Sequence, residues 1–263
     1  MVKMHSKRIV LSTEDGIARI VLSRPDSGNA IDLEFAQELE VVANQAEVRR
    51  ARVVVISALG NQFCVGGDLR SFSKERDLSS HLQRVTSHLH AGIAQLASVD
   101  APLIVVVNGV AAGAGLGLVC AADLVIAGTS STFLMAYTRL GLTPDGATSW
   151  YLARHIGLRR AIELSLTNRI LSAREALEWG VITQVVDDEK VTEVSESMIN
   201  RLATGPTGAF GATKRLLNSA ADDSLHEHLA LESDTMSARA QTGDAREGIA
   251  AFLERRDPVF TGE

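Results

Sequence analysis

The stretch from Val105 to Gly146 has the sequence VVVNGVAAGAGLGLVCAADLVIAGTSSTFLMAYTRLGLTPDG and decides the fold. It begins inside an apolar run, residues 103–107, whose β-branched side chains predict a buried strand. A loop rich in glycine and alanine follows at residues 109–117, and an apolar segment up to Ala122 then predicts a short buried helix. Glycine lets a ligand approach the backbone, and a helix start leaves amide N–H groups without acceptors. The stretch therefore predicts a site where backbone amides can hold a developing oxyanion.

The same stretch ends in a turn signal that carries a carboxylate, Thr143-Pro144-Asp145-Gly146. A proline followed by Asp-Gly marks a turn, which here leads into the next predicted helix. On the residues alone, Asp145 is either a turn or N-cap residue or a general base in a site formed with the small-residue loop. Both interpretations stay open at this point.

The hydrophobic pattern along the chain predicts β–α alternation followed by an all-helical tail. Apolar or alternating runs predict strands at residues 8–11, 17–22, 52–57, 103–107 and 181–186. The first two are predicted to form a hairpin with an Asp-Gly turn at Asp15-Gly16. Helical periodicity and capping signals predict helices at residues 32–46, 79–98, 149–156, 159–166 and 172–179, the last of which begins with a capping box of Ser172 and Glu175. From Val191 onward the pattern is helical. We therefore expect an α/β fold, with an α/β core at residues 1–200 and a C-terminal helical subdomain at residues 201–263.

The composition, with 263 residues, 46% hydrophobic and 22% charged, is typical of a soluble globular protein. The net charge of −6 and the lack of a Lys/Arg-rich run argue against a nucleic-acid partner. With no signal-type or membrane-length apolar run, we expect a cytoplasmic protein. Cys64 and Cys120 lie in separate apolar stretches, which favours buried thiols over a disulfide or metal site. His81 and His88 are predicted to be solvent-exposed and, at about 10 Å apart, too distant to share a metal.

Four segments together resemble the crotonase (enoyl-CoA hydratase/isomerase) family over essentially the whole chain. They are the loop Arg24-Pro25 to Asn29-Ala30, FCVGGDL at residues 63–69, NGVAAGAGLGLVCAAD at residues 108–123, and the tail EGIAAFLERRDPVF at residues 247–260. The resemblance implies a spiral of ββα units whose helical C-terminal region forms a homotrimer or homohexamer. It also implies acyl-CoA chemistry, with the CoA thioester as substrate and no further cofactor or metal.

The resemblance assigns an oxyanion hole to the backbone N–H groups of Gly67 and Ala114. On the residues alone, the FCVGGDL segment could equally be a tight turn that requires glycine. Losing one oxyanion donor typically costs about 2.7–4 kcal/mol of transition-state stabilisation. For CoA binding the resemblance indicates residues of the first two loops and of the closing helix, namely Arg24, Asn29, Ala30, Gly66, Asp68, Leu69 and Arg255.

The chain departs from the family at both positions where hydratases carry a glutamate, because it has Gly117 and Tyr137 there. Neither side chain can act as a general base at neutral pH, so ordinary hydration of a 2-enoyl-CoA is not expected. The segment FLMAYTRLGLTPDG, residues 133–146, resembles the enoyl-CoA and ring-epoxide isomerase branch. In that branch the aspartate matching Asp145 moves a proton between carbons, and a single carboxylate suffices because it can remove and return the same proton.

Two alternatives remain. The same region also resembles the 4-chlorobenzoyl-CoA dehalogenase branch, in which Asp145 would be a nucleophile and His90 would activate water. A thioester hydrolase that uses the same two residues in these roles belongs to this alternative. The tryptophan-lined pocket of that branch is not reproduced, because Leu89 and Tyr137 stand at those positions. The other alternative is an acyl-CoA binder without catalytic activity that has lost both glutamates. The resemblance therefore predicts an isomerase first, with these two hypotheses behind it.

Overall fold

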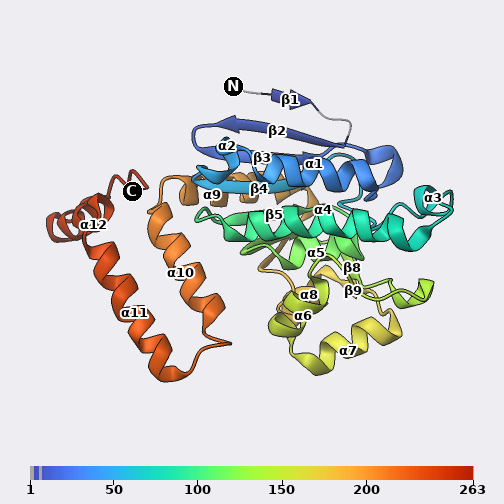
Figure 1. The fold of residues 1–263 in the computed structure, drawn as a ribbon. Coiled ribbons are helices and arrows are strands. Elements are labelled where there is room, and N and C mark those ends of the chain that lie inside the picture. Colours follow the sequence, from blue (N-terminus) through green and yellow to red (C-terminus); the bar gives the residue numbers. More distant parts are fainter. Residues whose placement is uncertain (1–2, 6–7, 263) are drawn as a thin grey trace.

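The computed structural model describes residues 3–5 and 8–262. Its centre is a seven-stranded sheet with the strand order β1-β2-β3-β4-β5-β7-β10 (Figure 1). The pairs among β1, β2 and β3 are antiparallel, and every pair from β3 to β10 is parallel. The strands of this sheet are β1 (Lys3–His5), β2 (Ile9–Glu14), β3 (Ile17–Leu22), β4 (Val53–Ala58), β5 (Leu103–Val107), β7 (Leu124–Gly128) and β10 (Gln184–Val186).

A second sheet is small and was not expected from the sequence. It consists of β6 (Val110–Ala112), β8 (Thr132–Leu134) and β9 (Leu171–Ser172). β6 lies inside the segment 109–117 that we predicted to be a loop throughout. These strands have only two or three residues, so they lack the run of four to eight residues on which a strand pattern depends.

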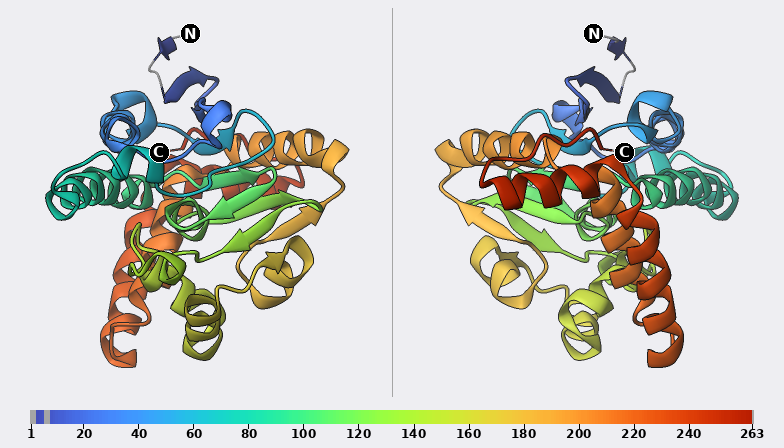
Figure 2. Two further views of the ribbon diagram at one scale, coloured as in Figure 1. Left: turned by 90° about the vertical axis from the view of Figure 1, so that its right-hand side faces the viewer. Right: turned by 90° about the vertical axis from the view of Figure 1, so that its left-hand side faces the viewer.

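Helices cover both faces of the large sheet, and Figure 2 shows α1 and α4 side by side on one of them. The other face carries α9, which contacts β4, β5 and β7. The helices before the C-terminal region are α1 (Leu33–Ala43), α2 (Ala46–Arg49), α3 (Leu69–Phe72), α4 (Leu78–Ser98), α5 (Ala114–Cys120), α6 (Thr148–Ile156), α7 (Leu158–Thr167), α8 (Ala173–Trp179) and α9 (Val191–Ala203).

The central strands are buried on both faces, as their continuous apolar runs predict. On β4, Val54 and Ile56 belong to the large core that includes α1 and α4, whereas Val53 and Val55 pack with Ile199 of α9. Side chains of one strand alternate between the faces of a sheet, so this single strand contributes to two cores. The sheet is thereby held between two apolar layers.

Several local predictions are confirmed. The β2–β3 hairpin turns at Asp15 and Gly16, whose φ angles of 50° and 76° suit a type I′ Asp-Gly turn. Ser172 and Glu175 form the predicted capping box at the start of α8. The predicted strand at residues 181–186 is shorter in the structure, because only β10 pairs with β7. The expected α/β class with a helical C-terminal region is confirmed.

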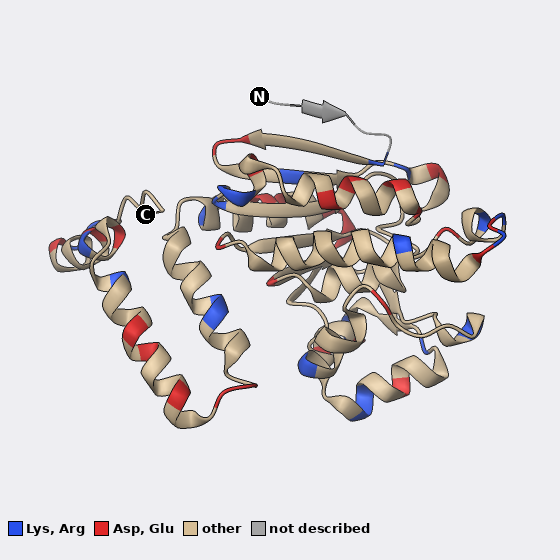
Figure 3. Ribbon diagram, viewed as in Figure 1, with Lys and Arg blue, Asp and Glu red and all other residues tan. Residues whose placement is uncertain are grey.

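The C-terminal arm, which consists of α10 (Thr207–Ser219), α11 (Leu225–Ala240) and α12 (Gly243–Glu254), extends away from the sheet (Figure 1). Its first helix is fixed to the core by Lys214, whose ammonium lies 2.6 Å from Asp123 and donates to two backbone carbonyls. Helix α11 carries acidic residues along its length (Figure 3) and buries no side chain. The domain boundary at residue 200 stays a prediction. No helix in the described part of the chain is long and apolar enough to span a membrane.

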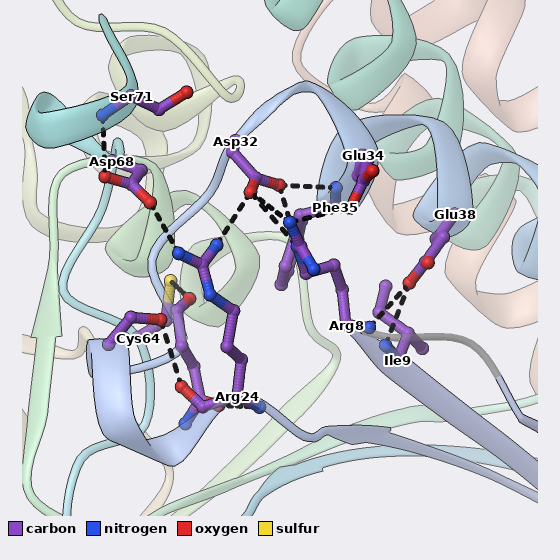
Figure 4. Close-up of polar contacts among 12 residues, drawn as sticks. Arg8, Ile9, Arg24, Asp32, Glu34, Phe35, Glu38, Cys64, Asp68 and Ser71 are labelled. Atoms are coloured by element: carbon purple, nitrogen blue, oxygen red, sulfur yellow. Dashed lines mark hydrogen bonds and ion pairs between the residues drawn. The ribbon is translucent and has the colours of Figure 1, made fainter. Parts of the chain in front are cut away.

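An ion-pair network joins the starts of α1 and α3 (Figure 4). The Arg24 guanidinium donates to Asp32 at 2.7 Å and to Asp68 at 2.8 Å, and Arg8 also pairs with Asp32. Asp32 caps α1 by accepting from the Phe35 amide, and Asp68 caps α3 in the same way. Because Asp68 follows Gly67 directly, the network fixes the loop that carries Gly67.

The network lowers the pKa of both carboxyl groups. Burial alone would raise the pKa of Asp32, but hydrogen bonds from Arg8 and the Phe35 amide outweigh it. For Asp68, burial is likewise outweighed by the hydrogen bond from the Ser71 amide and by the hydrogen bond and charge of Arg24. A lowered pKa in the folded state stabilises the fold above the ordinary carboxyl pKa, and this contribution is lost as the pH falls through the lowered value.

Replacing Arg24 by methionine tests the network. We expect Arg24→Met to lower the free energy of unfolding by about 3 kcal/mol at neutral pH, because it leaves a buried carboxylate without its counter-charge. The difference from the unmodified protein should shrink as the pH falls from about 4, the ordinary carboxyl pKa, through the lowered pKa values at which both groups become protonated in the folded protein. Urea unfolding at a series of pH values measures both effects.

The matched control is Arg70→Met on α3. Arg70 is exposed and forms no ion pair within residues 8–262, so we expect its substitution to change stability by less than about 0.5 kcal/mol. A loss of stability on Arg24→Met that stays constant from neutral to acidic pH would contradict the account, because the contribution would then not depend on ionised carboxylates.

Candidate active site

A cavity of about 410 Å³ lies between the loops of the oxyanion motifs, α4 and the segment before α6. Most of its wall is apolar, with the side chains Leu82, Val85, Leu89, Met135, Leu140 and Leu142 among those that line it. Gly67, Ala114, Tyr137 and Asp145 line it as well. The structure therefore brings the two predicted oxyanion donors and the predicted carboxylate to one cavity.

The backbones of the two oxyanion loops are in direct contact. Cys64 and Ala112 exchange strand-like hydrogen bonds with the opposite loop, at 3.0 Å from the Cys64 amide to Val110 and 2.9 Å from the Ala112 amide to Cys64. A Cβ atom on Gly66 would lie 2.9 Å from the Ala112 carbonyl oxygen, and Gly66 has a φ of +90°. Only glycine allows this approach at this backbone conformation.

The close approach places two amides without acceptors beside the same cavity. Within residues 8–262, the N–H groups of Gly67 and Ala114 donate to no protein acceptor. Ala114 is the first residue of α5, where a helix has no internal acceptor for its N–H groups. Two unpaired donors beside an apolar cavity are suited to hold a negatively charged oxygen.

Asp145 presents its carboxylate to this cavity and does not use it as a helix cap. The backbone carbonyl of Asp145 accepts from the amide and the hydroxyl of Thr148, at 3.0 and 2.6 Å. Helix α6 has Ala147 at its N-cap, with no side-chain cap hydrogen bond. One carboxylate oxygen, Oδ1, accepts a 2.5 Å hydrogen bond from the hydroxyl of Tyr137. The backbone of Asp145 thus forms the turn, and its side chain remains available to the cavity.

The position of Gly117 is closed to any side chain. A Cβ atom there would lie 2.4 Å from the Gly146 carbonyl oxygen and 2.9 Å from the Thr148 hydroxyl. Both atoms belong to the segment that follows Asp145. A glutamate therefore cannot occupy this position without displacing the turn that carries Asp145.

His90 contacts the turn and does not line the cavity. Its Nε2 accepts a 3.0 Å hydrogen bond from the Gly146 amide. An imidazole nitrogen that accepts a hydrogen bond has its lone pair engaged, so it cannot at the same time remove a proton from water. This geometry favours a structural contribution of His90 to the Asp145 turn, while its predicted role in activating water stays a prediction.

Four of the residues predicted to bind CoA line a second hollow of about 820 Å³, namely Arg24, Ala30, Asp68 and Leu69. This hollow shares Val65, Gly67 and Leu69 with the first cavity, so the two adjoin at the oxyanion loop. Both guanidinium nitrogens that Arg24 uses in the ion-pair network bind protein carboxylates, so its charge is offset within the chain.

The other predicted CoA residues lie elsewhere. Asn29 is buried, and its side chain donates to the carbonyls of Leu59 and Gln62 at 3.0 and 2.9 Å. Gly66 lines the first cavity. Arg255 is the C-cap of α12 in the C-terminal arm and lines neither hollow.

Phe72 is a site residue that the sequence analysis did not identify. Its ring occupies the space beside Gly67, where a Cβ atom would lie 2.6 Å from a ring carbon. The ring of His81 packs edge-on against Phe72 at 5.5 Å, and His81 is buried. The prediction that His81 is solvent-exposed is therefore wrong, because α3 folds back over α4 and covers it. His88 is partly exposed and lies 2.6 Å from Glu40.

The two thiols do not supply a nucleophile. Cys64 and Cys120 are both buried, as predicted from their apolar surroundings. Burial raises the pKa of each thiol to about 12. A thiol with such a pKa stays protonated at neutral pH, and the protonated form is a poor nucleophile.

The chain is similar to known proteins over nearly its full length. The family model described as enoyl-CoA hydratase/isomerase matches residues 12–263. The 1,2-epoxyphenylacetyl-CoA isomerase of Escherichia coli is 38% identical over 261 residues, which cover 97% of this chain and 98% of that protein. 4-Chlorobenzoyl coenzyme A dehalogenase-2 of an Arthrobacter species is 31% identical over 244 residues, which cover 92% of this chain and 88% of that protein.

Solved structures show the same fold. The crystal structure of an enoyl-CoA hydratase from Bacillus anthracis superimposes with a TM-score of 0.90 at 27% identity, and the match covers 98% of this chain and 100% of that one. The predicted crotonase-type fold is confirmed by this likeness and by the family match. The chain belongs to the enoyl-CoA hydratase/isomerase (crotonase) family of acyl-CoA enzymes.

Proposed function

We propose that the protein isomerises an enoyl-CoA by moving a proton, with Asp145 as the base and the amides of Gly67 and Ala114 as the oxyanion hole. The observation that carries this proposal is the cavity with one carboxylate, two unpaired backbone donors and a largely apolar wall. An apolar wall suits an acyl chain, and the unpaired donors suit a thioester oxygen.

The proposed reaction needs one base and no added water. Asp145 removes a proton from C2 of a 3-enoyl-CoA, and the electrons of that C–H bond move toward the thioester carbonyl. The amides of Gly67 and Ala114 stabilise the oxygen, which carries the negative charge of the dienolate. The protonated Asp145 then returns the proton to C4, which leaves the double bond between C2 and C3. Asp145 therefore both removes and returns the proton, and no second acid–base group is needed.

Hydration is less well supported because it requires an activated water and a proton donor. The first of the two glutamate positions is Gly117, where the Gly146 carbonyl excludes a side chain. The second is Tyr137, whose hydroxyl is engaged with Asp145. Asp145 is then the one carboxylate that lines the cavity within the described residues.

Two other functions have less support. In the dehalogenase-like alternative, Asp145 attacks an aromatic ring and His90 activates water, and the similarity to the Arthrobacter dehalogenase favours it. The engagement of His90 with the Gly146 amide speaks against it. An acyl-CoA binder without activity would not need a carboxylate at the apolar cavity. Removing that carboxylate from water would then cost free energy without any return in catalysis.

The CoA portion fits the second hollow, which adjoins the oxyanion loop. Ala30, Asp68 and Leu69 line this hollow, and we propose that they contact CoA. Arg24 contributes by holding Asp68 and Asp32 in place. The thioester would then lie at the junction of the two hollows, where Gly67 is found. The chemistry requires no cofactor besides the CoA thioester itself.

Replacing Asp145 by asparagine tests the base. We expect Asp145→Asn to reduce kcat for the conversion of a 3-enoyl-CoA into the conjugated 2-enoyl-CoA about 10²- to 10⁴-fold, because general base catalysis contributes that much. The rise in absorbance of the conjugated thioester measures the rate. Asp187→Asn, on the exposed Asp187–Lys190 pair, is the matched control and should leave kcat unchanged.

Retention of full activity in Asp145→Asn would show that the base lies elsewhere. If the unmodified protein converts no 3-enoyl-CoA, the simple enoyl isomerase is refuted, and three hypotheses remain: isomerisation of a ring epoxide, the nucleophilic Asp145 and the inactive binder. Turnover of 4-chlorobenzoyl-CoA that depends on both Asp145 and His90 would then identify the second of them.

We also propose that the chain forms a homotrimer or homohexamer through the C-terminal arm. The arm exposes large apolar side chains, with Met236 at 72%, Phe252 at 83% and Leu253 at 75% exposure. Apolar groups exposed together indicate an interaction surface. Arg255 follows these residues as the C-cap of α12. In such an assembly its charged side chain would lie near the CoA site of a neighbouring subunit.

An aspartate at Phe252 tests the assembly. We expect Phe252→Asp to convert the oligomer into monomers in sedimentation velocity, because it places a charge in an apolar contact. Val41→Asp on α1, which is 50% exposed, should leave the oligomer intact. A monomeric unmodified protein, or an unchanged sedimentation coefficient in Phe252→Asp, would contradict the proposal.

A further inference from the structure

The hydroxyl of Tyr137 and the carboxylate of Asp145 form a short hydrogen bond. The phenol oxygen lies 2.5 Å from Oδ1 of Asp145. An O–H···O⁻ hydrogen bond to an ionised acceptor has a length of about 2.5–2.7 Å, whereas a neutral hydroxyl pair is typically longer. The distance lies at the short end of the O–H···O range, which suits donation from the phenol to a carboxylate.

The backbone of Tyr137 is fixed on both sides. Its amide donates to Met135 at 2.9 Å, and its carbonyl accepts from Leu140 at 2.9 Å and from Leu142 at 3.2 Å. The ring lies against the oxyanion loop, because a Cβ atom on Gly113 would be 3.7 Å from the ring carbon that bears the hydroxyl. A ring held in this way can hold the carboxylate in one orientation.

The hydrogen bond leaves the second carboxylate oxygen available. In the described part of the chain, Oδ2 of Asp145 has no hydrogen-bond partner, whereas Oδ1 is engaged by the phenol. Burial, together with the charge and the hydrogen bond of Asp145, raises the pKa of Tyr137. The phenol thus remains a hydrogen-bond donor at neutral pH and does not compete for the substrate proton.

We propose that Tyr137 is a positioning residue that holds Asp145 through Oδ1, so that Oδ2 exchanges the proton with the substrate. This inference rests on the proposed function and extends it, because it assigns a task to the residue that replaces the second glutamate. Tyr137 acts through Asp145 and does not itself exchange a proton with the substrate.

Removing the hydroxyl tests the kinetic consequence. We expect Tyr137→Phe to lower kcat for 3-enoyl-CoA isomerisation about 10- to 100-fold, the usual effect of losing a hydrogen bond to a charged group, with KM within about twofold. Tyr151→Phe is the matched control, because Tyr151 is the other tyrosine of the chain and does not line the cavity. A structural defect would instead change KM and the thermal unfolding midpoint.

A spectroscopic measurement tests the contact without any substrate. In a Tyr151→Phe background, the ultraviolet absorbance of tyrosinate reports Tyr137 alone. Because the charge of Asp145 raises the pKa of Tyr137, adding Asp145→Asn should shift the tyrosinate titration to lower pH. The comparison is restricted to the pH range in which circular dichroism shows both variants to be folded.

The two measurements separate this inference from the proposed function. Equal tyrosinate midpoints in the two variants while both remain folded overturn the inference, whatever the kinetics show. An active unmodified protein with an equally active Tyr137→Phe variant also overturns it. If the titration shifts and the unmodified protein converts no 3-enoyl-CoA, the Tyr137–Asp145 pair stands and the isomerase assignment fails.

Discussion

The backbone contact between the loops at Gly66 and Gly113 is the constraint on which the site depends. The strand-like pairing of Cys64 with the opposite loop brings the two backbones together, and glycine is required where Gly66 meets the Ala112 carbonyl. Without this approach, the amides of Gly67 and Ala114 would not line one cavity. The parallel strands β4 and β5 precede the two loops, so the sheet delivers both loops to the same edge.

Three sets of polar contacts hold the reactive groups in place around this contact between the loops. The Arg24 network fixes the start of α3 immediately after Gly67, and His90 fixes the turn at Gly146. Tyr137 orients the Asp145 carboxylate. Each contact joins segments distant in the chain or separated by a turn, so the site is rigid although it lies on loops. A rigid arrangement benefits catalysis because the donors and the base need no reorganisation during the reaction.

The parts of the fold that follow local rules could be predicted from the sequence. The Asp15-Gly16 hairpin, the buried strands β4 and β5 and the amphipathic α4 all follow from spacing and turn chemistry. The small sheet could not be predicted, because the partners of its two- and three-residue strands lie far away in the sequence. The oxyanion amides were identified by resemblance, since a backbone N–H has no sequence signature. Ala136, which directly precedes Tyr137, has a φ of 62°, and the residue type alone does not predict this left-handed conformation.

The central claim is that this site moves a proton and does not add water, and product analysis tests it most directly. The purified protein would be incubated separately with a 3-enoyl-CoA and with a trans-2-enoyl-CoA. The thioesters would then be separated and their masses determined by mass spectrometry. The account predicts interconversion of the two isomers at unchanged mass. Rapid accumulation of a 3-hydroxyacyl-CoA, heavier by one water molecule, would contradict it, because Asp145 is the one carboxylate that lines the cavity within the described residues.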